Sequence, residues 1–115
     1  MSGLRRFDNW PERLAAFLAQ HEKTPFAWGR HDCALFAADA MHVMTGVDLA
    51  APFRFQYSTA LGARRKMEEF CAGGGLEQVA EKICAEHGME EIAVSLAQRG
   101  DLVLFAFPEC RSLGI

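Results

Sequence analysis

Apolar side chains recur at helical spacing in the first part of the chain. Phe17 and Leu18 lie three and four residues after Leu14, and Pro11 precedes them at a position that suits the first turn of a helix. This spacing predicts a helix over roughly residues 11–22, with its apolar face turned inward.

A second helical pattern follows an aromatic loop and is apolar over most of its circumference. Asp32 is a suitable N-cap, the apolar positions continue to Met44, and Gly46 is a suitable C-terminal stop. A helix that is apolar on nearly all sides is typically buried on nearly all sides. We therefore expect this helix to be the central one.

Two further helices are predicted after an irregular connection over residues 46–57. Ser58 is expected to cap the third helix, which ends at the three glycines of residues 73–75. The fourth helix follows from apolar positions within residues 76–84 and ends at His87 and Gly88.

The pattern then changes from helical to extended. Residues 98–101, Gln-Arg-Gly-Asp, are a turn signal, and residues 102–107 are short, apolar and aromatic, as in a buried strand that Pro108 closes. Residues 112–115 are expected to begin another strand. We therefore predict a single α+β domain over residues 1–115 with a short antiparallel sheet.

This sheet raises a structural problem. One strand and a four-residue stub do not form a stable sheet alone, and an apolar strand with an open edge invites pairing. Two explanations stay open. Either the chain is a C-terminally truncated version of a longer domain, or a partner chain completes the sheet, and that partner could be a second copy.

Composition restricts the class of protein. The 115 residues suffice for one domain with a modest core, and 50% hydrophobic with 23% charged residues is typical of a globular protein. The net charge of −3 and the scattered arginines do not favour a nucleic-acid partner. The N-terminus lacks a secretory signal pattern and the apolar runs are too short to cross a bilayer, so we expect no membrane association and a cytoplasmic location.

The four cysteines are expected to be free thiols in a reducing compartment. No pair of them has C-x-x-C spacing, and nothing in the sequence indicates a metal or an organic cofactor. Cys33 stands apart because it follows the cap candidate Asp32. The first turn of a helix stabilises a thiolate through free backbone N–H groups, and His31 adds positive charge, whereas the Asp32 carboxylate disfavours the thiolate. Spacing alone leaves open whether Cys33 is a nucleophile or an inert buried thiol.

Several motifs together resemble a known family. They are W-G-x-x-D-C-A-L-F-A-A-D-A from Trp28, T-G-V-D from Thr45, R-x-x-Y from Arg54 to Tyr57, and A-Q-R-G-D-L-V-L-F from Ala97. In this order they resemble phage- and prophage-encoded proteins related to the NlpC-type cell-wall peptidases. The resemblance implies a papain-like α+β fold in which the nucleophile opens a helix packed on an antiparallel sheet. It implies that Cys33 holds the nucleophile's position.

The catalytic histidine of those peptidases has no counterpart here. In the peptidases that this chain resembles, the second strand begins H-V-G-I and its histidine is the general base, whereas this sequence has Ser112 at that position. A hydroxyl cannot exchange a proton near neutral pH as imidazole does. The residue that orients the histidine would lie beyond Ile115. Among the other histidines, His31 is the one that could still approach Cys33 by folding back.

The remaining candidates have both functional and structural explanations. Trp28 and Phe26 either line a substrate cleft or pack over the helix start. Arg54 and Tyr57 are also expected to line the cleft, where they would brace its loop. Asp39 is expected to pair with an arginine or to face solvent.

Two functions follow from the resemblance. One is a non-catalytic phage tail component that binds a partner protein through an open sheet edge. The other is a cysteine peptidase or amidase that uses Cys33 on bacterial cell-wall peptides. Either function places the protein in the cytoplasm or in a virion.

Overall fold

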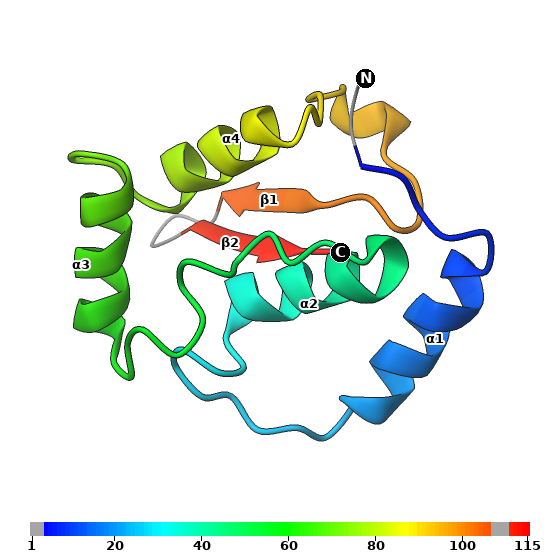
Figure 1. Ribbon diagram of the computed structural model, residues 1–115, viewed down its shortest axis with the longest axis horizontal. Coiled ribbons are helices and arrows are strands. Elements are labelled where there is room, and N and C mark those ends of the chain that lie inside the picture. The colour runs from blue at the N-terminus through cyan, green and yellow to red at the C-terminus, as the bar shows by residue number, and fades with distance from the viewer. Residues whose placement is uncertain (1–3, 107–110) are drawn as a thin grey trace.

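The computed structural model describes residues 4–106 and 111–115. The described residues form an α+β protein with four α-helices, a short 3₁₀ helix and a two-stranded antiparallel sheet, as Figure 1 shows. The predicted mixture of helices and a short antiparallel sheet is therefore confirmed. In chain order the elements are α1 (Trp10–Gln20), α2 (Cys33–Thr45), α3 (Ala60–Phe70), α4 (Leu76–Glu86), η1 (Val94–Leu96), β1 (Val103–Ala106) and β2 (Arg111–Gly114).

Helix α2 is the central element, as its apolar circumference predicts. Asp32 is its N-cap, with extended backbone angles and a side chain that accepts the Leu35 N–H. Gly46 ends it in the left-handed conformation, at φ 81°, which a residue without Cβ adopts at little cost. Seven residues of α2 are buried: Leu35, Ala37, Ala38, Ala40, Met41, Met44 and Thr45.

Helix α1 packs against α2 and is shorter than predicted at its C-terminal end. It runs from Trp10 to Gln20, with Pro11 in its first turn. Leu14 and Phe17 are its buried residues, and they join the α2 side chains in the main core cluster. Leu18 is 40% exposed, so the inward face of α1 is narrower than the sequence indicated.

Helices α3 and α4 are less firmly packed than α2. Each buries a single residue, Ala63 in α3 and Val79 in α4. Thr59 caps α3, so the predicted Ser58 cap was wrong by one residue. The reason is geometric, because the Thr59 hydroxyl lies 3.0 Å from the Gly62 amide, three residues ahead, as an N-cap requires.

The sheet consists of two four-residue strands. Leu104 pairs with Leu113 and Phe105 with Ser112 in an antiparallel register. β2 begins at Arg111, one residue before the predicted start, and packs against α2 and α4. The predicted strand end at Phe107 and Pro108, and the predicted packing role of Cys110, lie outside the described residues.

The turn before β1 was predicted and η1 was not. The Gln98 N–H donates to the Asp101 carboxylate over 2.8 Å, and the Asp101 N–H donates back to the Gln98 carbonyl over 3.0 Å.

In the part of the chain that the structure describes, no helix has both the length and the apolar character needed to cross a membrane.

Candidate functional site

The start of α2 is organised around the buried carboxylate of Asp32, which is 3% exposed. Its Oδ1 accepts the Leu35 N–H at 2.9 Å. Its Oδ2 accepts the Gly29 N–H at 3.1 Å and the Tyr57 hydroxyl at 2.6 Å. One carboxylate therefore caps the helix and fixes the loops on both sides of it.

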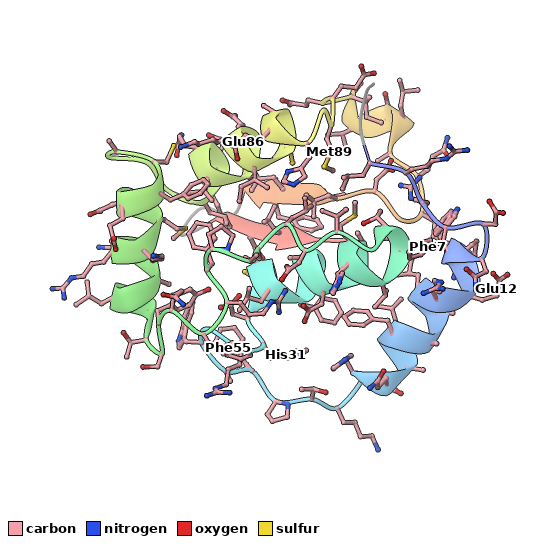
Figure 2. All side chains as sticks on the ribbon, in the orientation of Figure 1. Phe7, Glu12, His31, Phe55, Glu86 and Met89 are labelled. Atoms are coloured by element: carbon pink, nitrogen blue, oxygen red, sulfur yellow. The ribbon has the colours of Figure 1, made fainter. Side chains whose placement is uncertain are left out.

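The loop before α2 folds back on itself and meets the loop that ends at Tyr57. Ala27 and His31 form an isolated antiparallel bridge, and Gly29 lies between them at φ 78°. A Cβ on Gly29 would lie 1.9 Å from the Tyr57 carbonyl oxygen, so only glycine allows this approach. The Gly29 carbonyl accepts the Phe55 N–H at 2.9 Å. Figure 2 labels His31 and Phe55, one from each loop, near the start of α2.

Tyr57 serves as a hydrogen-bond donor in this site. Burial raises the pKa of Tyr57 far above its ordinary value, and the adjoining Asp32 carboxylate raises it further. A protonated phenol donates to Asp32 and cannot act as a base near neutral pH. Tyr57 is thus a positioning group, in agreement with the bracing role that the sequence suggested.

Arg54 fixes the connection between α2 and α3 to the side of α2. Its guanidinium lies 2.7 Å from the Asp39 carboxylate and forms two hydrogen bonds, of 3.0 and 2.8 Å, to Asp48. The pairing of Asp39 with an arginine is therefore confirmed. Hydrogen bonding by Arg54 lowers the pKa of Asp48, and the same contact raises the pKa of Arg54.

Cys33, the first residue of α2, lies on the wall of a cavity. The cavity has a volume of about 460 Å³ and is bordered by α2, α3, α4 and β2. Cys33 is half-buried and is a free thiol. Most of the wall is apolar, with contributions that include Leu35, Ala38, Phe53, Met67, Val79 and Ile83. Among the described residues, the polar and charged side chains on the wall are Asp32, Cys33, Tyr57, Arg64, Cys84 and Arg111.

The aromatic candidates differ in position. Trp28 lines the cavity, whereas Phe26 does not and is 58% exposed. The two rings meet edge to face with their centroids 4.9 Å apart. Of the four residues predicted to line the cleft, Trp28 and Tyr57 lie on the cavity wall, whereas Phe26 and Arg54 do not.

The candidate proton acceptors are not among the residues that line the Cys33 cavity. The His31 ring stacks on His21 with 5.4 Å between centroids and meets Phe36 edge-on at 5.6 Å. All four histidines are among the described residues, and none of them lines the cavity. Ser112 is not on the wall either, since Arg111 and Leu113 face the cavity and side chains alternate along a strand.

The structure also reveals wall residues that the sequence analysis missed. Arg64 lines the cavity from α3 and Arg111 from β2, and Cys84 does so from α4. The sequence held a signal for Arg64, because Ala60, Ala63 and Met67 lie at helical spacing around it and reach the same cavity. Across the described residues, no group of three or more His, Cys, Asp or Glu side chains is arranged to hold a metal ion.

Comparison with known proteins gives a family and no function. A model of a domain of unknown function, DUF6950, matches residues 5–115, so the chain belongs to that family. No curated protein and no solved structure matches the chain.

Proposed function

We propose that this member of the DUF6950 family is a non-catalytic relative of the NlpC-type cysteine peptidases, associated with a phage or prophage tail, that binds another protein. The order of its motifs supports the relationship. So does the arrangement at α2, a helix that opens with Asp32 as cap and Cys33 as first residue and that packs against β2 of the antiparallel sheet. On this proposal the fold is papain-like, with a helical half and a short sheet.

The main support for a non-catalytic protein is that, among the described residues, no histidine lines the cavity beside Cys33. A cysteine hydrolase needs a base within hydrogen-bond reach of the thiol, and that base must later protonate the leaving group. His31 is held against His21 and Phe36 instead. Tyr57 stays protonated because burial raises its pKa. Cys33 is therefore left with the helix terminus alone to activate it.

The sheet supplies the binding surface in this proposal. β2 pairs with β1 along one side, and within residues 4–106 and 111–115 no strand pairs with its other side. Such an edge accepts an extended segment through backbone hydrogen bonds. The partner is a phage tail protein, and a second copy of the chain could use the same edge.

The alternative is an active peptidase or amidase on cell-wall peptides. The observation in its favour is the position of Cys33 at a helix N-terminus and on a cavity wall. In the described structure the N–H groups of Cys33 and Ala34 have no hydrogen-bond acceptor, so they are free to stabilise an oxyanion.

A hydrolysis assay separates the two functions. Purified cell-wall peptides are incubated with the wild-type chain and with Cys33→Ala, and the products are analysed by mass spectrometry. We expect no cleaved peptide from either protein, and alkylation of Cys33 by iodoacetamide at mildly acidic pH no faster than that of Cys71. Cleavage by the wild type that Cys33→Ala abolishes would establish the peptidase instead.

Amide hydrogen exchange tests the binding surface. Purified tail proteins are added one at a time, and a partner bound at the sheet edge should slow exchange within residues 111–114 while leaving α1 unchanged. Binding of a tail protein with protection confined to other segments would rule out the sheet edge as the interface.

A further inference from the structure

The cavity beside Cys33 has the shape and chemistry of a ligand site in its own right. Its volume of about 460 Å³ lies in the range of small-molecule pockets. It follows α4 from Leu76 to Cys84, which at 1.5 Å per residue is about 12 Å of helix. The cavity is therefore elongated, and its walls along α4 are largely apolar.

The charged groups of the wall gather toward one end. In Figure 1 the starts of α2 and β2 lie on the side of α3. Arg111 is the first residue of β2 and Arg64 belongs to α3, so both arginines join the wall from this side. The opposite end of the α4 wall is formed by Ile83 and Cys84. Burial raises the pKa of the Cys84 thiol, so this end stays uncharged near neutral pH.

In the described part of the chain, the wall carries two guanidinium groups and one carboxylate, so positive charge is in excess. Asp32, the carboxylate on the wall, already accepts three hydrogen bonds from Leu35, Gly29 and Tyr57. Among the described residues, neither Arg64 nor Arg111 has a carboxylate within ion-pair distance. Two unpaired guanidinium groups beside an apolar cavity complement a ligand with an anionic head and an apolar tail.

We propose that the cavity binds an amphipathic carboxylate, a medium-length unbranched acyl chain whose carboxylate lies at Arg64 and Arg111 and whose tail extends along α4. The proposal goes beyond binding at the sheet edge, because the cavity is lined from α2, α3 and α4 as well as from β2. It requires no reaction at Cys33.

Calorimetric titration of the full chain with decanoate, below its critical micelle concentration, tests the proposal. We expect one decanoate per chain. Decanol, which has the same tail and no charge, should bind about tenfold more weakly, and decylamine more weakly still. Arg64→Gln and Arg111→Gln should each weaken decanoate binding about five- to tenfold. Arg65→Gln, an exposed neighbour on α3 that is not on the wall, is the matched control and should bind as the wild type does.

A second variant tests the tail position. Ala80→Phe places a ring in the cavity, and it should abolish decanoate binding while the circular dichroism of the helices stays unchanged. Equal affinities for decanoate and decanol, or an effect of Arg65→Gln as large as that of Arg64→Gln, would overturn the proposed head-group site. A dimer in light scattering whose formation Ala80→Phe prevents, with no uptake of decanoate, would assign the cavity to a second copy instead.

The outcome of the decanoate titration does not depend on whether the protein is a peptidase or a tail component. Decanoate binding needs no cleavage of a cell-wall peptide, and cleavage of a cell-wall peptide needs no bound decanoate, so either experiment can fail while the other succeeds.

Discussion

At the scale of single residues, Gly29 is the position where the fold tolerates least change. The Tyr57 carbonyl occupies the place of a Cβ, at 1.9 Å, and the backbone has φ 78°. We expect Gly29→Ala to lower the free energy of unfolding by at least about 3 kcal/mol, because the loop before α2 must separate from Tyr57. Urea unfolding monitored by circular dichroism measures this change.

Gly73→Ala is the matched control for that experiment. Gly73 also has positive φ, 70°, but no atom lies within 4 Å of where its Cβ would be. Gly73→Ala should therefore lower the free energy of unfolding by only about 1–2 kcal/mol, which is the cost of holding alanine at positive φ. Equal losses in the two variants would mean that the contact with Tyr57 contributes nothing.

Tyr57 can be examined directly because it is the chain's single tyrosine. Burial and the Asp32 carboxylate raise the pKa of Tyr57, so the neutral phenol is favoured in the folded state. Stability from this group is present below the unfolded pKa of about 10 and is lost as pH rises above it. In a spectrophotometric titration, we expect phenolate absorbance only when the protein unfolds in alkali, and at the ordinary pH in urea. A phenolate that forms near pH 10 with the helices intact would contradict the buried hydrogen bond to Asp32.

Short-range rules account for the site residues that the sequence predicted. Asp32 as N-cap and Gly46 as C-cap follow from their immediate neighbours along the chain. The bond from Tyr57 to Asp32 joins residues 25 apart in the sequence, and no local pattern specifies it. The ring contact between His31 and His21 is likewise tertiary, which is why His31 could be considered as a base for Cys33.

At the scale of elements, the ion pairs of Arg54 hold the connection between α2 and α3. Because hydrogen bonding by Arg54 lowers the pKa of Asp48, this carboxylate contributes stability above its unfolded pKa of about 4 and loses it as pH falls through the lower folded pKa. We expect Asp48→Asn to destabilise the protein at pH 7. The difference from the wild type should shrink progressively below about pH 4. Urea unfolding at a series of pH values gives both curves, and a difference that stays constant would exclude Asp48 as the titrating group.

The strands show where element-level prediction stops. Side chains alternate along β2, so Arg111 and Leu113 face the cavity together. Because the sequence placed the start of this strand at Ser112, it did not predict that Arg111 lines the cavity. The cap of α3 differed by one residue for a comparable reason, since Ser58 and Thr59 are both favoured N-cap residues and the hydrogen bond from the Gly62 N–H selects Thr59.

At the scale of the whole molecule, α1 and α2 are packed more tightly than α3 and α4. The main core cluster joins α1 and α2, whose buried residues include Leu14, Phe17 and Met44. Helices α3 and α4 bury one residue each and border the cavity. The cavity removes the apolar contacts that would otherwise bind these two helices to α2.

This division predicts the order in which the helices open. Local opening requires less free energy where few apolar contacts are broken, so backbone amides in α3 and α4 should exchange with solvent at least about tenfold faster than those in the middle of α2. Hydrogen exchange with mass spectrometry of peptides from each helix measures the difference.

A ligand that fills the cavity restores the missing contacts, so decanoate should slow exchange in α3 and α4 and leave α1 unchanged. Uniform exchange across all four helices would mean that the structure opens as one cooperative unit and that the cavity does not weaken it.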